Sequence, residues 1–303
     1  MRQVGLVGVG DMGIGLAANL IEAGYPVTGF DLRAERLAAL EELGGSAAAS
    51  VRAVGARCDA VFVMVLNGAQ VQAVAAELLE ELRPGATIIV TATITPDEMR
   101  AVLPMTAERQ VHLVDCPVSG GKAGADAGTL TLMAAAPAAA IEANRELLDA
   151  IGSTLWHVGE EVGAGQTVKA ALQVVIGANY AAIFEALVLG VKAGVPAQTL
   201  YDVIGSTAVG GPLFRNCASL IMQRRFRGTG SHLGTMYKDL CISMDVARAN
   251  GVPMFTAAAA KELFQAGIAR FPGEDNWAIV KILEELAGTE VRGAEEPRAE
   301  AQP

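Results

Sequence analysis

The sequence predicts an α/β domain with a doubly wound, mostly parallel sheet, then one long linking helix and an all-α domain. Three observations lead to this fold class. Apolar strand-like segments alternate with helix-like segments over the first half of the chain. A nearly unbroken apolar helical run covers residues 166–193. Beyond it, helical patterns separated by glycine and proline clusters continue to about residue 286.

The composition is typical of a compact protein with sizeable cores. The chain has 303 residues, of which 52% are hydrophobic and 18% charged, a length that suits two domains. The formal net charge of −10 gives no electrostatic reason to bind nucleic acid or an anionic membrane. An anionic substrate would therefore need a local positive group.

The cysteine and histidine patterns argue against a disulfide framework and against a metal site. The four cysteines form no Cys-x-x-Cys pair, and the three histidines have no ligand spacing to each other or to the cysteines. Free thiols are typical of a reducing compartment. Because Met1 and Arg2 lead directly into a strand and no apolar run has the length of a membrane span without charge or glycine, we expect no signal peptide, no membrane span and a cytoplasmic location.

The α/β domain is expected to cover residues 1–162. Its strands are predicted at 4–7, 27–30, 60–66, 87–91, 111–115 and 130–134. Its helices are predicted between them, at 13–23, 33–43, 69–82, 96–103 and 137–151. Ligands of such sheets bind beyond the carboxyl ends of the strands, so the loops after Leu66, Thr91 and Asp115 are the first candidates for a site.

The strongest functional signal lies in the first thirty-one residues. An apolar strand runs into Gly8-Val9-Gly10-Asp11-Met12-Gly13, a helical pattern follows, and a second strand ends in Asp31. This arrangement is the fingerprint of a Rossmann-type dinucleotide site. Gly8 permits the tight turn, Gly10 lets a pyrophosphate approach the backbone, and Gly13 lets the helix lie close to the sheet. The helix N-terminus offers its N–H groups to the phosphates.

Asp31 favours NAD over NADP as the dinucleotide. A carboxylate at this position can accept hydrogen bonds from both ribose hydroxyls, and it would repel the 2′-phosphate of NADP. Arg33 follows two residues later and offers that phosphate a partial partner. NAD is therefore the predicted cofactor, with NADP as the less favoured alternative.

The long apolar run predicts an inter-domain helix over residues 163–193, which Gly194 and Pro196 end. Because the run is apolar nearly all round, we expect it to be buried between domains or subunits, and we expect a homodimer or homotetramer. An all-α domain is predicted over residues 194–288. The charged, proline-containing residues 289–303 are expected to form a flexible tail.

One candidate substrate-binding segment follows the predicted strand that ends at Asp115. It contains Ser119, Gly120 and Gly121. The Ser119 hydroxyl and the backbone N–H groups of the two glycines can together bind a carboxylate. The alternative is an ordinary glycine turn.

A candidate catalytic segment lies near the start of the long apolar helix, where Lys169 stands among apolar residues. Partial burial is expected to lower the pKa of its ammonium, and such a lysine can exchange a proton with an alcohol. Gln173 lies one turn later on the same helix face and can hold the substrate. The alternative is that Lys169 reaches solvent or binds a structural carboxylate.

Four motifs, in order, resemble those of the β-hydroxyacid dehydrogenase family, whose members are 3-hydroxyisobutyrate dehydrogenase-like. Together the four motifs span residues 1–288. They are the cofactor signature at 8–13 with Ala18-Asn19-Leu20, the substrate loop at 115–121 continuing through 128–133, the catalytic segment at 163–169, and Lys238-Asp239-Leu240. In order and at these intervals the motifs are highly specific.

The resemblance implies roles for individual residues. Lys169 would be the general acid/base, and Ser119, Gly120, Gly121 and Gln173 would bind the substrate. The dinucleotide would be held by Gly8, Gly10, Asp11, Met12, Gly13, Asp31, Val65, Leu66, Thr93 and Lys238. For Lys238 a surface ion pair with the following acid is the alternative.

Two departures from the family pattern bear on the substrate. Leu172 stands where many members have asparagine, so one polar substrate contact is expected to be absent. Val65-Leu66-Asn67-Gly68 stands where others have Leu-Pro, and this variant resembles the L-threonate dehydrogenase branch. An apolar pocket wall would also admit a bulkier or aryl 3-hydroxy acid.

The main hypothesis is NAD-dependent oxidation of the hydroxyl of a small, carboxylate-bearing 3-hydroxy acid, with Lys169 taking the hydroxyl proton. Imine reduction on the same fold is one alternative, although imine reductases usually carry Asp or Tyr in place of the lysine. The second enzymatic alternative is an aryl 3-hydroxy acid dehydrogenase. A nucleotide-binding protein with a vestigial site is the non-enzymatic alternative.

Overall fold

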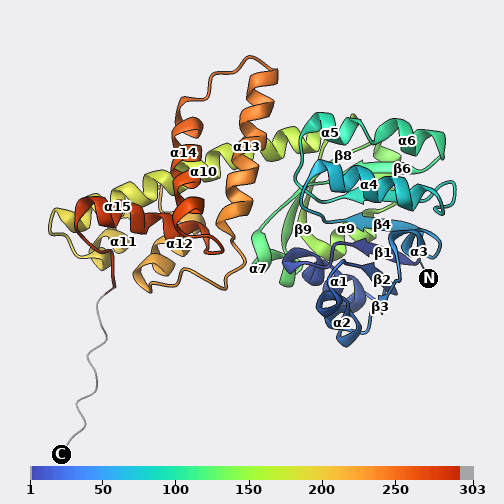
Figure 1. Cartoon of the computed structure of the whole chain (residues 1–303), viewed down its shortest axis with the longest axis horizontal. Helices are drawn as coiled ribbons and strands as arrows, with labels where there is room; N and C mark the ends of the chain where they lie inside the picture. The colour runs from blue at the N-terminus through green and yellow to red at the C-terminus, as the bar shows by residue number, and fades with distance from the viewer. Residues whose placement is uncertain (1, 294–303) are drawn as a thin grey trace, which may run out of the picture. The chain divides into compact units, whose positions relative to one another are not determined.

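The computed structural model describes residues 2–293, and contacts along the chain divide it into two compact units (Figure 1). The division falls between Ala171 and Leu172, inside the long helix α10 (Ala164–Lys192). A single helix therefore contributes its first two turns to one unit and the rest to the other.

The first unit is built on a mostly parallel sheet. In the described chain the strand order is β3-β2-β1-β4-β5-β6-β8-β7, with β9 also paired to β8. The strands β1 to β6 run parallel, whereas β8 is antiparallel to β6 and β7. The strands are β1 (Val4–Val7), β2 (Val27–Phe30), β3 (Ser46–Ala47), β4 (Ala60–Val63), β5 (Thr87–Val90), β6 (His112–Asp115), β7 (Val118–Ser119), β8 (Leu130–Ala135) and β9 (Gly152–Gly159).

Helices cover both faces of this sheet (Figure 1). They are α1 (Asp11–Glu22), α2 (Ala34–Glu42), α3 (Val51–Gly55), α4 (Gly68–Leu79), α5 (Pro96–Arg100), α6 (Leu103–Glu108), α7 (Gly121–Asp126), α8 (Ala138–Glu142) and α9 (Arg145–Ile151). Alternate residues of a strand belong to different core clusters: Phe62 packs with α1 residues, and Val63 packs with α4 residues. The expected doubly wound α/β fold is confirmed.

Some elements of the first unit differ from those expected. The helix predicted at 137–151 is two helices, α8 and α9, which meet at Asn144. Strand β9 was not expected at all, because it is an edge strand whose side chains are mostly exposed, among them Trp156 at 61%. Its sequence therefore lacks the apolar run that signals a buried strand.

The second unit is helical in its described part. After α10 come α11 (Ala197–Gly205), α12 (Pro212–Met222), α13 (Leu233–Ala249), α14 (Phe255–Arg270), the short 3-10 helix η1 (Asn276–Ile279) and α15 (Val280–Ala287). Its core contains Phe184 of α10, Phe264 of α14 and Trp277 of η1, all of them at most 1% exposed. The expected all-α architecture after the long helix is confirmed.

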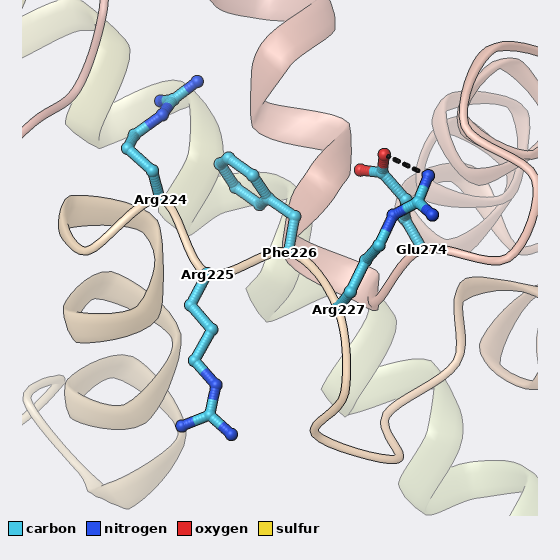
Figure 2. Close-up of a pocket in the computed structure, with 5 residues that line it drawn as sticks. All are labelled: Arg224, Arg225, Phe226, Arg227 and Glu274. Carbon is cyan, nitrogen blue, oxygen red and sulfur yellow. Dashed lines mark hydrogen bonds and ion pairs between the residues drawn. The ribbon is translucent and has the colours of Figure 1, made fainter.

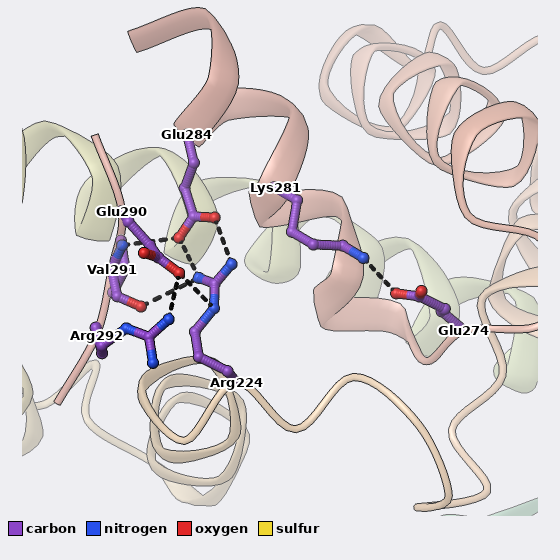
Figure 3. A network of polar contacts seen from close by, with 7 residues as sticks. All are labelled: Arg224, Glu274, Lys281, Glu284, Glu290, Val291 and Arg292. Atoms are coloured by element: carbon purple, nitrogen blue, oxygen red, sulfur yellow. Dashed lines mark hydrogen bonds and ion pairs between the residues drawn. The ribbon is translucent and has the colours of Figure 1, made fainter. Parts of the chain in front are cut away.

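A network of charged groups links the last described residues of the second unit to its helices (Figure 3). Arg224 forms a two-point ion pair with Glu284, with N–O distances of 2.5 and 2.9 Å, and a further contact of 3.1 Å with Glu290. The Glu284 carboxylate also accepts the Val291 N–H at 2.8 Å. Since the Glu284 side chain is only 6% exposed, this network fixes the turn after α12 to α15.

The same network shows that residues 289–293 are not the flexible tail that the sequence predicted. Val291 is fully buried, and Gly293 donates its N–H to the Met222 carbonyl at 3.1 Å. The charge of this segment, which indicated solvent exposure, is partly used in ion pairs with Arg224. Residues 294–303, the remainder of the expected tail, lie outside the described residues.

Helix α10 is long and apolar enough to cross a membrane by length and composition alone, with a mean hydropathy of 1.9 over its best window. One such helix is weak evidence for a span, because core helices of water-soluble proteins meet the same test. Phe184 and Leu187 of α10 are both fully buried in the core of the second unit, which gives its apolar residues a packing role.

Candidate functional site

The glycine-rich turn between β1 and α1 has the geometry that a dinucleotide needs. Gly8 has a φ of +94°, in the left-handed region, and a Cβ on Gly13 would lie 2.0 Å from the Gly8 carbonyl oxygen. The N-cap of α1 is Gly10, which has no side chain to occupy the N–H groups of the first turn. The residues present therefore fit a pyrophosphate at this helix N-terminus.

Asp31 lies directly after β2 and is held against this turn. Its carboxylate accepts the Val9 N–H at 2.9 Å and the Arg33 N–H at 3.0 Å. The Arg33 guanidinium is 3.5 Å from the same carboxylate, and Asp11 pairs with Arg36 at 2.8 Å. The first unit thus gathers the predicted dinucleotide residues Gly8, Gly10, Asp11, Met12, Gly13 and Asp31 at one turn.

The other predicted cofactor residues of the first unit lie in loops after neighbouring parallel strands. Val65 and Leu66 follow β4, and Leu66 is 70% exposed, with its N–H bonded to Gln70 Oε1 at 2.8 Å. Thr93 follows β5 and is partly buried. Both loops lie at the carboxyl edge of the sheet, where ligands of this fold bind.

The predicted carboxylate-binding segment joins β7 to α7. Ser119 ends β7 and is partly buried, whereas Gly120 and Gly121 are exposed. Both glycines have positive φ, of 136° and 61°, which turns the backbone sharply just after the serine. The backbone N–H groups and the hydroxyl that the sequence singled out are therefore adjacent on an accessible turn.

Lys169 is buried, at 6% exposure, in the second turn of α10. The start of its helix is attached to the carboxyl ends of β5 and β6. The Asp115 carboxylate, fully buried, accepts the Gly163 N–H at 2.8 Å and the Gln166 side-chain amide at 2.9 Å. Gln166 also bonds the backbone on both sides of Thr93, so it links the predicted cofactor loop to the helix.

In the second unit, one carboxylate joins the two predicted site residues. Gln173 Nε2 donates to Asp239 Oδ2, and Lys238 Nζ lies 2.9 Å from Asp239 Oδ1. Gln173 is 6% exposed, and its Oε1 accepts no hydrogen bond from any described residue. An acceptor buried without a donor is costly, so this oxygen is suited to receive a ligand hydrogen bond.

Asp115, Gln166 and Asp239 are the functional candidates that sequence reasoning missed. Asp115, Gln166 and Asp239 all lie inside motifs that the sequence analysis identified, but no spacing rule linked Asp115 to Gln166 or Asp239 to Gln173. For Asp115, a further local signal was an acidic residue at the end of a buried strand.

A separate surface cavity of about 370 Å³ lies in the second unit and is lined by Arg224, Arg225, Phe226, Arg227 and Glu274. Figure 2 shows the Arg224 and Arg225 side chains pointing to opposite sides, so the guanidinium groups do not converge. Arg227 is paired with Glu274 at 3.1 Å. This cavity therefore lacks the geometry of a built anion site.

Within residues 2–293, no group of three or more His, Cys, Asp or Glu side chains could hold a metal ion. The four cysteines are free thiols, three of them buried, and burial raises the pKa of the Cys58 thiol to about 11. The candidate site therefore depends on the lysine, the glycine-rich turns and the two carboxylate networks.

Two family models together match most of the described chain. The family model described as the NAD binding domain of 6-phosphogluconate dehydrogenase matches residues 3–159. The model described as "NAD-binding of NADP-dependent 3-hydroxyisobutyrate dehydrogenase" matches residues 163–283.

Individual relatives are similar over nearly their full length. The chain is 36% identical to L-threonate dehydrogenase of Cupriavidus necator, over 93% of this chain and 96% of that protein. A solved 3-hydroxyisobutyrate dehydrogenase from Salmonella typhimurium has a TM-score of 0.85 and 32% identity, covering 93% of this chain and 100% of that one.

Imine reductases are more distant. The enzyme from Streptomyces aurantiacus is 20% identical with a TM-score of 0.65, over 93% of this chain and 99% of that one, and shows a shared fold alone. Relatives of 30% identity or more are named as dehydrogenases of hydroxy acids, and the chain is an oxidoreductase of that kind, acting on CH–OH groups. The expected resemblance is confirmed, and the chain belongs to the β-hydroxyacid dehydrogenase family, in its L-threonate dehydrogenase branch.

Proposed function

We propose that Lys169 is the general acid/base in the oxidation of a small 3-hydroxy acid. The observation that carries this role is that Lys169 is only 6% exposed, on a helix whose start is attached to the carboxyl edge of the dinucleotide sheet. Burial removes water that would compete for the alcohol proton. Because the start of the helix is held in place, the backbone position of Lys169 is held in place too.

Different residues of the first unit would bind the dinucleotide and transfer the proton. The 8–13 turn and Asp31 would hold the dinucleotide, with Val65, Leu66 and Thr93 beside its nicotinamide half. A dinucleotide held by these residues would supply the acceptor for the hydride that leaves the carbinol carbon of the substrate. Lys169 takes the hydroxyl proton, and in the reverse direction it returns that proton and stabilises negative charge on the oxygen.

Ser119, Gly120 and Gly121 would bind the substrate carboxylate, supported by the accessible turn with two positive φ angles. In the second unit, Lys238 would contact the dinucleotide and Gln173 the substrate, and both are held by Asp239.

The test is Lys169→Ala, with Lys192→Ala as the matched control from an exposed position of the same helix. We expect kcat to fall about 10²–10⁴-fold in the first variant, with the dissociation constant for NADH within about twofold of wild type. The control should keep full activity. A Lys169→Ala enzyme with near-normal kcat would reject the assignment.

For the cofactor, we propose a preference for NAD over NADP. The support is the Asp31 carboxylate, fixed by two backbone N–H groups where a ribose would lie. Arg33 is already engaged with this carboxylate at 3.5 Å, which weakens its use for a 2′-phosphate. Comparing kcat/KM for both cofactors in wild type and in Asp31→Ser tests this, and an unchanged NAD/NADP ratio would contradict it.

For the substrate, we propose a hydroxy acid that carries an additional hydroxyl group, such as threonate. The support is the buried Gln173 Oε1, which would accept a hydrogen bond from that hydroxyl. The similarity to L-threonate dehydrogenases points to the same class. Progress curves with threonate, 3-hydroxyisobutyrate, an aryl 3-hydroxy acid and a cyclic imine separate this proposal from its alternatives.

We propose a homodimer or homotetramer that uses the exposed face of α10. Val175, Ala182 and Leu189 follow one another at seven-residue intervals, and Val175 and Leu189 are 56% and 71% exposed. Light scattering of wild type and Leu189→Lys checks this, because a monomeric wild type would contradict it.

We also propose a cytoplasmic location, supported by four free thiols.

A further inference from the structure

We propose that Asp115 and Gln166 are positioning residues that hold Lys169 in register with the Thr93 loop. Neither residue needs to touch the substrate for this role. Asp115 ends strand β6, and Gln166 lies in the first turn of α10, one turn before Lys169. Because they act through Lys169, their role rests on the catalytic function proposed for that lysine.

The Asp115 carboxylate binds the start of the helix at several points. Its Oδ2 accepts the Gly163 N–H at 2.8 Å and the Gln166 N–H at 3.3 Å, and its Oδ1 accepts Gln166 Nε2 at 2.9 Å. A negative charge at a helix N-terminus is favourable, because the free N–H groups and the helix dipole face it. Asp115 thus sets where α10 begins.

The approach between this carboxylate and the helix is so close that it needs a glycine. A Cβ on Gly165 would lie 3.0 Å from the Asp115 carboxyl carbon and 2.5 Å from the Met133 carbonyl oxygen. Any larger residue would push the first turn of α10 away from β6 and β8. The sequence at this turn therefore favours one fixed position of the helix.

Gln166 extends the attachment to the loop after β5. Its Nε2 donates to the Ala92 carbonyl at 3.0 Å, and its Oε1 accepts the Ile94 N–H at 3.1 Å. These two backbone groups flank Thr93, which is predicted to line the nicotinamide half of the cofactor site. One fully buried side chain therefore fixes both the predicted cofactor loop and the helix that carries Lys169.

The side-chain polar atoms of Asp115 and Gln166 all form hydrogen bonds within the protein. In this respect the pair differs from a substrate-binding group. Gln166 forms bonds through both ends of its amide, and Asp115 through both oxygens. A displacement of about 1 Å at a reacting group costs on the order of 10²-fold in rate. Loss of the Asp115 carboxylate, which bonds Gly163 and Gln166 and not the Thr93 loop itself, should therefore lower kcat while leaving cofactor affinity nearly unchanged.

The experiment is a double-mutant cycle of Asp115→Asn with Lys169→Ala, read as kcat, KM and the NADH dissociation constant. In the wild-type background we expect Asp115→Asn to lower kcat on the order of 10²-fold. In the Lys169→Ala background the same change should cost at most about threefold, because its target is already gone. An equal loss in both backgrounds would overturn the positioning role.

Gln166→Met provides a second variant of similar length without polar atoms, and it should show the same dependence on Lys169. The matched control is Asn144→Leu, which removes a buried amide bonded to Ala140 and Thr87 in the same unit. The control should lose stability but keep kcat. If both test variants fail to fold while the control folds, the pair is merely structural. A normal kcat in Lys169→Ala would instead reject the role of the lysine itself.

Discussion

Two glutamines on one helix, Gln166 and Gln173, are both buried but differ in how fully their amides are hydrogen-bonded. Gln166, in the first unit, is bonded through both ends of its amide. Gln173, in the second unit, donates to Asp239 but leaves Oε1 without a donor among the described residues. The i, i+7 spacing places both on the same helix face.

This difference in hydrogen bonding distinguishes a structural side chain, Gln166, from a side chain that can still bind a ligand, Gln173. Burying a polar atom without a partner costs about 1–3 kcal/mol, so an unpaired acceptor is retained where a ligand can supply the donor. A fully bonded amide, in contrast, contributes rigidity and register. Fully bonded networks should therefore respond to mutation through stability or position, and half-bonded groups through substrate recognition.

Glu284→Met tests the fully hydrogen-bonded groups, and it is expected to have the largest effect on stability. Glu284 belongs to the Arg224 network of the second unit. Removing this carboxylate leaves the Arg224 guanidinium, 19% exposed, without its two-point partner and the Val291 N–H without an acceptor. We expect the free energy of unfolding to fall by about 3 kcal/mol with kcat unchanged. Urea denaturation and steady-state kinetics measure both.

The matched control for that variant is Glu290→Gln, which removes a half-exposed partner of the same arginine. Exposed pairs contribute little, so a loss below about 1 kcal/mol is expected. Equal losses in the two variants would show that burial does not distinguish these carboxylates.

Gln173→Met tests the half-bonded class. The change removes the unpaired acceptor, and we expect kcat/KM for threonate to fall about 10–100-fold, equivalent to about 1–3 kcal/mol. A substrate without the additional hydroxyl, such as 3-hydroxyisobutyrate, should lose much less. Since Asp239 loses a donor in either case, the ratio between the two substrates is the informative quantity. A uniform loss would contradict a role in recognition.

The smallest expected effect is a pH dependence of stability from Asp115. Burial raises the pKa of this carboxyl from 3.8 to about 6, against the opposing bonds from Gly163 and Gln166. The folded state then binds the proton more tightly than the unfolded chain, so the contribution to stability is full below pH 4 and is lost as pH rises through about 6. Between pH 5 and 7 the loss is about 1 kcal/mol.

Denaturation of wild type and Asp115→Asn at pH 5 and pH 7 isolates this contribution, because other titrating groups are common to both proteins. The stability of wild type relative to the variant should be lower at pH 7 than at pH 5. A difference that does not change with pH would show that Asp115 has its ordinary affinity for the proton.

Much of the fold could be predicted from the sequence, because local signals were strong and agreed. The strands predicted at 4–7 and 27–30 were found with the same bounds, and the helix predicted at 163–193 is α10, Ala164–Lys192. Mostly apolar runs bounded by glycine, proline or polar residues define these elements. Strand β9 escaped because an edge strand with exposed side chains leaves no such pattern.

The predicted site residues stood in motifs with fixed local spacing, such as Gly8, Gly10 and Gly13. The contacts that hold them depend on tertiary structure and could not be found in the same way. Asp115 and Gln166 are 51 positions apart, and Gln173 and Asp239 are 66 apart. No local periodicity links such pairs, so only the folded chain shows which carboxylate faces which amide.

The segment after α15, which is anchored by the buried Val291, has a practical consequence for anyone who shortens this polypeptide. Cutting after Gly288 would remove Val291 from the hydrophobic core and would leave the Met222 carbonyl without the N–H of Gly293. Affinity tags and fluorescent fusions are therefore better attached after residue 293 than directly after the last helix.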